Sequence, residues 1–278
     1  MKLSRILTIS RPRFWLYEAG TFALGVLAGW GTQSSLFFAI VFGLYFLIPA
    51  NILIYGINDV FDYDTDTLNP IKVAYEALVP PSEHRSVYLW IICTTIPFLF
   101  AVPYLSIHAL VSFCIFLFCA IFYSAKPIRA KARPVFDSFF SALHYVATGV
   151  FGYYLVGGVG IPFIGIIAGI SWAVAMHAYS AVPDIEADTS AGLKTVATFL
   201  GTKYTLLLCG VLYLVSGMVT FTVFPYVASI TTVVYLFLLY KSYKAKTSEN
   251  LFTLYTYFPY INALVGMIIF FSLLFKIL

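Results

Sequence analysis

Charge is scarce in this 278-residue sequence, since only 10% of its residues are Asp, Glu, Lys or Arg. The hydrophobic share is 61%, which excludes an ordinary soluble domain and an intrinsically disordered chain. Only 4 cysteines occur, each inside a long apolar run and without the spacing of a metal knuckle. We therefore expect the cysteines to pack as small apolar side chains, and no disulfide framework.

Long apolar runs dominate the sequence, and nine of them are near the length of a transmembrane helix. The first run lacks a small-residue cleavage site and is followed directly by others, so we expect no signal peptide. No linker or low-complexity tract interrupts the chain. We expect an all-α, polytopic membrane protein with a single domain over residues 1–278. The nine predicted spans are residues 14–31, 36–57, 86–104, 107–124, 134–156, 161–183, 203–224, 226–241 and 254–275.

The basic residues fall almost entirely on one side of the predicted membrane. The N-terminus and the segments 58–85, 125–133, 184–203 and 241–253 carry fifteen of the 16 Lys and Arg residues. The connections on the opposite side and the C-terminus carry only Lys276. Because cytoplasmic loops are enriched in Lys and Arg, we expect a cytoplasmic N-terminus and an external C-terminus.

Acidic residues gather in two clusters, at 58–66 and 184–188, which hold seven of the 12 in the chain. If the second apolar helix continues past Asn58, then Asp59, Asp62 and Asp66 share one face. Asp64 points elsewhere and is expected to be solvated.

The second cluster follows the sixth apolar run, as the first follows the second run, which predicts two similar four-helix halves and one extra helix. Asp184 and Asp188 lie one helical turn apart. Five aligned carboxylates at a membrane boundary are costly, and Mg²⁺ shared with a substrate phosphate would offset their repulsion. The alternative is a pair of hydrophilic loops in which Asp59 or Asp184 caps a helix.

A basic segment at 123–134 lies between the two clusters and holds four cations within eight residues. It is either a topogenic anchor or a clamp for a diphosphate that faces the metal ions. Lys194 follows the second acidic cluster closely and has the same possible role. The clamp hypothesis names Asn58, Lys126, Arg129, Lys131 and Lys194 as the diphosphate-binding residues.

These motifs resemble those of the UbiA superfamily of intramembrane prenyltransferases. That family carries N-D-x-x-D-x-x-x-D after its second helix and D-x-x-x-D after its sixth, and Tyr-Ser-x-x-Pro at 123–127 also fits. The resemblance implies a helical barrel around a central cavity, with two Mg²⁺ ions between the Asp clusters and a prenyl diphosphate. The implied metal ligands are Asn58, Asp59, Asp62, Asp66, Asp184 and Asp188, of which Asp62, Asp66, Asp184 and Asp188 are also counted as catalytic.

Two stretches, 123–138 and 180–188, are similar to the lycopene elongase branch of that family. This resemblance implies transfer of a C5 dimethylallyl group from its diphosphate to lycopene or a related carotenoid. A quinone precursor, a tetrapyrrole, haem or an ether lipid is the alternative acceptor. An ion or lipid transporter is the alternative of a different class, against which the lack of mid-membrane ionisable groups other than histidines argues. We expect the bilayer as a partner and no nucleic acid, and the sequence predicts no oligomeric state.

The remaining polar residues have open roles at this point. Tyr123 or Tyr179 would stabilise the allylic cation through an aromatic face. Arg11 and Arg13 either contact a polar acceptor or anchor the first span. Asp137 either pairs with the neighbouring basic residues or shapes the site. His144 and His177 are expected to be hydrogen-bonded core residues.

Overall fold

The computed structural model describes residues 1–31, 34–67, 73, 78–245 and 247–277. Lys72 and Lys246, which belong to the predicted cytoplasmic side, lie outside these residues. Every regular element within them is a helix, so the all-α prediction is confirmed. Five described segments are long and apolar enough to cross a membrane, which leaves the count of nine spans a prediction. These segments are Leu36–Asp66, Pro81–Tyr104, Phe163–Ser180, Val196–Phe221 and Glu249–Lys276.

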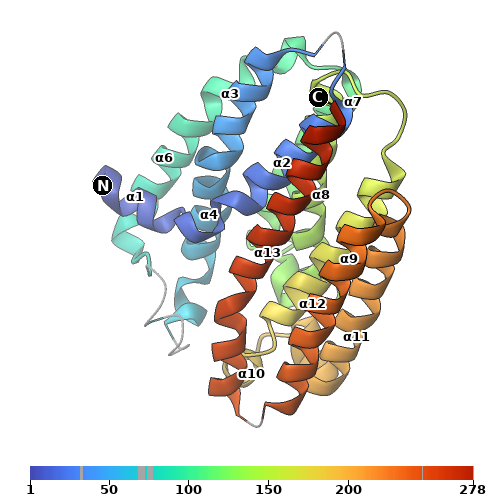
Figure 1. Cartoon of the computed structure of the whole chain (residues 1–278). Coiled ribbons are helices and arrows are strands. Elements are labelled where there is room, and N and C mark those ends of the chain that lie inside the picture. Colours follow the sequence, from blue (N-terminus) through green and yellow to red (C-terminus); the bar gives the residue numbers. More distant parts are fainter. Residues whose placement is uncertain (32–33, 68–72, 74–77, 246, 278) are drawn as a thin grey trace. The chain divides into compact units, whose positions relative to one another are not determined.

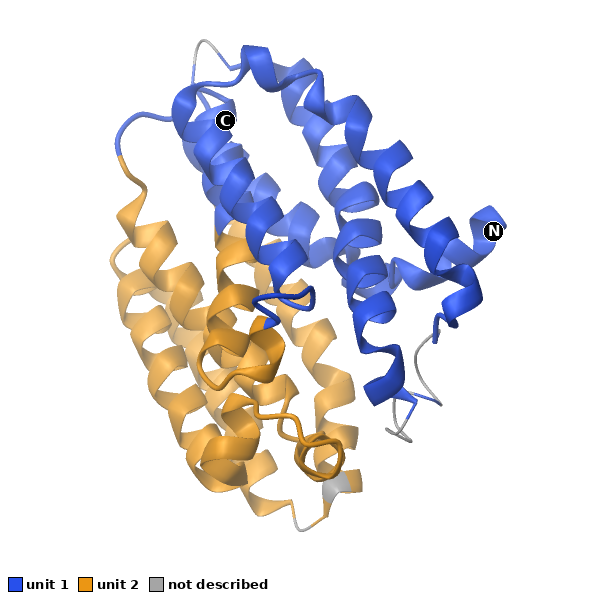
Figure 2. Cartoon of the chain, turned by 180° about the vertical axis from the view of Figure 1, so that it is seen from behind, with its two compact units in different colours: residues 1–129, 147–160, 273–278 blue, residues 130–146, 161–272 orange. Residues whose placement is uncertain are grey.

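The chain forms two compact units (Figure 2). Unit 1 contains residues 1–129, 147–160 and 273–278, and unit 2 contains residues 130–146 and 161–272. The first acidic cluster therefore belongs to unit 1 and the second to unit 2. Helices α8 (Phe136–Leu155) and α13 (Ser248–Ile277) contribute residues to both units.

Unit 1 is built around α4, which packs against α1, α3, α6 and α7 (Figure 1). A break at Ile48 separates α3 from α4, and Pro49 is the first residue of α4. The Asn51 amide donates to the carbonyls of Phe46 and Leu47 at 3.0 and 3.1 Å, which satisfies acceptors beside the break. The elements of unit 1 are α1 (Leu3–Ile9), η1 (Pro12–Phe14), α2 (Trp15–Gly29), α3 (Leu36–Leu47), α4 (Pro49–Asp66), α6 (Pro81–Leu99), η2 (Val102–Tyr104) and α7 (Ile107–Phe122), with parts of α8 and α13.

The core of unit 1 is a cluster of aromatic rings that contact one another rather than an open space. Phe42, for example, meets Phe151 edge-to-face with ring centroids 4.8 Å apart. These seven rings fill the interior of their own unit. The cluster consists of Phe22, Phe42, Tyr45, Phe46, Phe113, Phe116 and Phe151, all buried.

Unit 2 is held together by polar contacts between its helices as well as by apolar packing. Helix α11 packs against α9, α10 and α12. The Tyr235 hydroxyl accepts a hydrogen bond from Trp172 Nε1 at 2.9 Å and donates to Asn262 Oδ1 at 2.7 Å, which joins α9, α12 and α13. Such bonds stabilise helix pairs where water is absent. The elements of unit 2 are η3 (Ala130–Ala132), α9 (Phe163–Ser180), α10 (Ile185–Ser190), α11 (Val196–Phe221) and α12 (Pro225–Lys244), with parts of α8 and α13.

Helices α2 and α8 of unit 1 approach closely through glycines. A Cβ atom on Gly25 would collide with the carbonyl oxygen of Gly149, and one on Gly152 would lie 2.5 Å from the carbonyl oxygen of Phe22. Small residues permit this close backbone contact between membrane helices. The same pair of helices is joined by the buried Glu18 carboxylate, which accepts from Thr148 Oγ1 at 2.8 Å.

We predict that Gly25→Ala destabilises the protein by about 1–3 kcal/mol, because the added methyl group forces the two backbones apart. Gly20→Ala is the matched control, since a Cβ at Gly20 of the same helix meets no atom within 4 Å. Thermal unfolding of both purified variants in detergent measures the difference. Equal melting temperatures would contradict the close-contact interpretation.

Candidate functional site

Helix α4 places the first acidic cluster on one buried face. The helix continues to Asp66, beyond the predicted span that ends at residue 57, and so meets the condition for the shared face: Asp59, Asp62 and Asp66 lie on the same side. Their exposed fractions are 5%, 0% and 4%, whereas Asp64 is exposed. The predicted separation of Asp64 from the other three carboxylates is confirmed.

Two arginines bring positive charge to this face. Arg11 Nη2 lies 2.6 Å from Asp59 Oδ1, and Arg129 Nη2 lies 3.4 Å from Asp62 Oδ1. The Arg11 guanidinium also covers the ring of Tyr55, with 4.7 Å between its carbon and the ring centroid. Buried carboxylates are tolerated only with such compensation, so these pairs are part of what allows the acidic face to exist.

Asn58 joins the first cluster to the beginning of the basic segment. Its Nδ2 donates to Asp62 Oδ2 at 2.7 Å and to the buried Ser124 hydroxyl at 2.9 Å. Both Asp62 oxygens therefore have a polar contact, since Oδ1 faces Arg129. Arg129 is half-buried beside Asp62, whereas Lys126 is exposed and Tyr123 is half-buried, and their role in a clamp stays a prediction.

The second acidic cluster begins at the N-terminus of α10. Asp184 is the N-cap residue, and the backbone amide of Asp188 donates to its carbonyl oxygen at 2.8 Å. Both side chains are half-buried and Glu186 is exposed. The two carboxylates thus lie on one helical turn, as the spacing predicted.

The loop that carries Lys194 is held by hydrogen bonds on both sides of that residue. The Leu193 amide donates to the carbonyl oxygen of Asp188 at 2.8 Å. Asp137 Oδ2 accepts from the Val196 amide at 2.7 Å, and Thr195 forms a capping box with Thr198. Asp137 therefore orders the loop by accepting a hydrogen bond at the start of α11, and its two predicted roles stay predictions. Lys194 itself is exposed.

Of three further predicted residues of unit 2, Lys131 and Tyr179 are buried and His177 is half-buried. Lys131 is only 7% exposed, within η3. The Tyr179 hydroxyl bonds to Ser242 Oγ at 2.8 Å and its ring meets Phe258 edge-to-face, so it is packed between helices. His177 Nδ1 lies 3.1 Å from Ser138 Oγ, which agrees with a hydrogen-bonded core role. The catalytic role of Tyr179 stays a prediction.

The donor set of α4 fits a hard cation. Carboxylate and amide oxygens are the ligands that Mg²⁺ takes, and Mg²⁺ uses one or two carboxylates together with phosphate oxygens. Among the residues that the structure describes, no three His, Cys, Asp or Glu side chains are grouped closely enough to hold an ion by themselves.

Sequence reasoning did not identify Arg11 or Ser124 as parts of this site. Arg11 was expected to contact an acceptor or anchor a helix, but it pairs with a carboxylate 48 positions away. Ser124 lies 66 positions from Asn58. No local spacing signals either contact, although the Tyr-Ser-x-x-Pro match at 123–127 includes Ser124.

Comparisons with known proteins agree with this geometry. The sequence model of the UbiA prenyltransferase family matches residues 19–262. A lycopene elongase/hydratase of Halobacterium salinarum is 40% identical over 216 residues, which cover 77% of this chain and 78% of the relative. Its counterpart in Haloarcula japonica is 38% identical over 221 residues, covering 78% and 74%.

A solved structure shows the same fold. The UbiA homologue from Archaeoglobus fulgidus bound to DMAPP and Mg²⁺ superposes with a TM-score of 0.77. The sequence identity is 24%, and the match covers 97% of this chain and 98% of the other.

We predict that Asp137→Ala destabilises the protein by about 1–3 kcal/mol, because the buried Val196 amide loses its acceptor. Asp137→Asn is the matched control, since its side-chain oxygen still accepts the bond. Hydrogen exchange at the start of α11 and thermal unfolding report the loss. Similar protection in both variants and the native chain would exclude a capping role.

Proposed function

Because the chain belongs to the UbiA prenyltransferase family, we propose that it transfers a C5 dimethylallyl group from its diphosphate to lycopene or a related carotenoid. The observation that carries the chemistry is the buried face of α4, with three carboxylates and two arginines. The acceptor rests on the two lycopene elongase/hydratase relatives. The C5 donor rests on the resemblance to the lycopene elongase branch, because the A. fulgidus homologue is found with both DMAPP and GPP.

We further propose that residues 1–278 work as one membrane domain with a cytoplasmic N-terminus and an external C-terminus. The family match spans residues of both units, which supports a single functional domain. The one-sided distribution of Lys and Arg supports the orientation. Both acidic clusters then belong to the cytoplasmic boundary, where a charged diphosphate enters from water and an apolar acceptor enters from lipid.

Two Mg²⁺ ions, when bound, would neutralise the diphosphate and favour departure of the leaving group. In the proposed site, Asp59, Asp62 and Asp66 of α4, with Asp184 at the N-cap of α10 and Asp188 within it, would hold these ions. Asn58 orients Asp62 through its amide and offers a further oxygen.

The basic residues act on the leaving group. Arg129 and Lys131 follow one another closely in the basic segment, and Lys126 and Lys194 are exposed on loops where they can meet a diphosphate from water. As the allylic C–O bond breaks, its electron pair goes to the diphosphate oxygen. Cations that lie beside that oxygen stabilise the charge that develops there.

The apolar surroundings protect the organic half of the reaction. The allylic carbon forms a bond with an electron-rich double bond of the acceptor, and the product cation then loses a proton or takes up water. Excluding bulk water prevents capture of the allylic cation before this bond forms. An aromatic face, for which Tyr123 is better exposed than Tyr179, would stabilise the cation.

We predict that Asp62→Ala and Asp184→Ala each lower Mg²⁺-dependent diphosphate release by at least about 100-fold, because a metal ligand is lost. Asp64→Ala is the matched control, since Asp64 belongs to the same motif but is exposed. Diphosphate release by the purified chain with a C5 donor and acceptor measures the effect. Retained turnover in a variant with both Asp62 and Asp184 changed would refute the metal assignment, and absence of any diphosphate release by the native chain would favour transport.

Mass spectrometry of membranes that contain the protein, dimethylallyl diphosphate and a panel of acceptors tests the acceptor. We expect lycopene to gain one or two C5 units, with or without water. A quinone precursor that gains the C5 unit while lycopene does not would overturn the carotenoid assignment and leave the prenyl transfer intact.

A further inference from the structure

The contact between Arg11 and Asp59 is short and well shielded from water. The two charged atoms are 2.6 Å apart, and the side chains are 12% and 5% exposed. Charge-assisted hydrogen bonds of this length are stronger than neutral ones. In this structure a protein cation therefore occupies an oxygen that the proposed function assigns to a metal ion.

The backbone at Arg11 is held in an unfavourable conformation to make this contact. Arg11 has φ +52° and ψ +73°, in the left-handed region that residues with a Cβ rarely adopt. The following residue is Pro12, which disfavours helical conformations of its predecessor further. Strained residues of this kind persist where the surrounding structure fixes them, and they cluster at functional sites.

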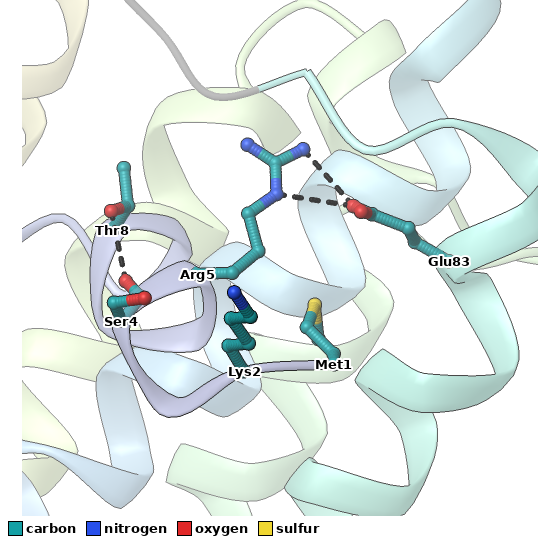
Figure 3. A pocket seen from close by; sticks show the side chains of 6 residues that line it. All are labelled: Met1, Lys2, Ser4, Arg5, Thr8 and Glu83. Carbon is teal, nitrogen blue, oxygen red and sulfur yellow. Dashed lines mark hydrogen bonds and ion pairs between the residues drawn. The ribbon is translucent and has the colours of Figure 1, made fainter.

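Helix α1 supplies that fixation from the other end. Ile6 and Ile9 are fully buried, and Arg5 reaches α6 (Figure 3). Arg5 Nη2 donates to the carbonyl oxygen of Leu78 at 2.6 Å and lies 3.0 Å from Glu83 Oε2. Arg5 and Glu83 are each one third exposed, and their contact fastens α1 to α6.

We propose that Arg11 is the resident counter-ion of Asp59 in the metal-free protein, and that it yields this carboxylate to the metal when a diphosphate arrives to receive the guanidinium. The proposal rests on the metal role of Asp59 in the proposed function. A guanidinium and a divalent ion repel each other at one carboxylate, so metal alone must displace Arg11 at a cost. A diphosphate lowers that cost because it offers the guanidinium a new anionic partner.

Metal and diphosphate consequently bind with positive coupling, and the coupling is the same from either side. Arg11 is a positioning residue in this scheme, since it acts through Asp59. The chain thereby disfavours a site that holds metal without substrate. In that state the acidic face would already be occupied when the donor arrives with its own metal ion.

The test is the affinity of the purified full-length chain for Mn²⁺ alone, followed by electron paramagnetic resonance of the free ion. We expect Arg11→Gln to bind Mn²⁺ about tenfold more tightly than the native chain, because no protein cation competes for Asp59. Arg13→Gln is the matched control and should leave Mn²⁺ affinity unchanged, because it removes the same charge from an exposed position two residues away. Arg11→Gln should also melt at a lower temperature without metal and recover when Mn²⁺ is added.

A second variant keeps the test decisive if Arg11→Gln fails to fold. Tyr55→Leu removes the ring beneath the guanidinium, which is expected to loosen Arg11 and tighten Mn²⁺ binding about two- to fivefold. Equal Mn²⁺ affinity in the native chain, Tyr55→Leu and any folded Arg11→Gln, or an equal change in Arg13→Gln, would overturn the proposal. If the variants bind Mn²⁺ as the native chain does while the native chain still releases diphosphate, this proposal fails and the proposed function stands.

Discussion

Burial of carboxylates in a chain with little charge is the constraint on which the rest of this structure depends. Asp59, Asp62 and Asp66 are nearly inaccessible on α4, where ionised groups lose most of their hydration. Cationic and amide groups must therefore be brought to them. Arg11 comes from the segment before α2 and Arg129 from the basic segment after α7, so two distant parts of the chain are recruited to one helix face.

The carboxylates of unit 2 need less compensation, because they are less buried. Asp184 and Asp188 are half-buried on a single turn, and the backbone around them is ordered by hydrogen bonds. The Asp137 carboxylate caps α11, while the Leu193 amide bonds to Asp188. The loop that carries Lys194 is thus fixed at both ends although Lys194 itself stays exposed. A fixed loop with an exposed cation suits capture of an anion from water better than permanent pairing inside the protein.

Periodicity and charge in the sequence were sufficient for the local features of the site. Given that α4 continues to Asp66, the shared face of three carboxylates and the exclusion of Asp64 both follow from a repeat of 3.6 residues. The Asn58–Ser124, Arg11–Asp59 and Glu18–Thr148 contacts do not, because they join positions 48 to 130 residues apart. The break at Ile48 and the filled aromatic core of unit 1 likewise depend on tertiary packing, which composition alone leaves open.

The two substrates of the proposed reaction differ in how easily their binding residues are recognised in a sequence. A diphosphate needs charges and metal ligands, which are rare in an apolar chain and therefore conspicuous. A carotenoid has no charge and is recognised by shape and by burial of apolar area, which spreads over many side chains of ordinary type. Here 48 of 278 residues are Phe or Tyr, and the ring cluster of unit 1 shows that many serve packing. The choice of acceptor consequently depends on the shape of an apolar surface, which a comparison with relatives or a direct assay distinguishes.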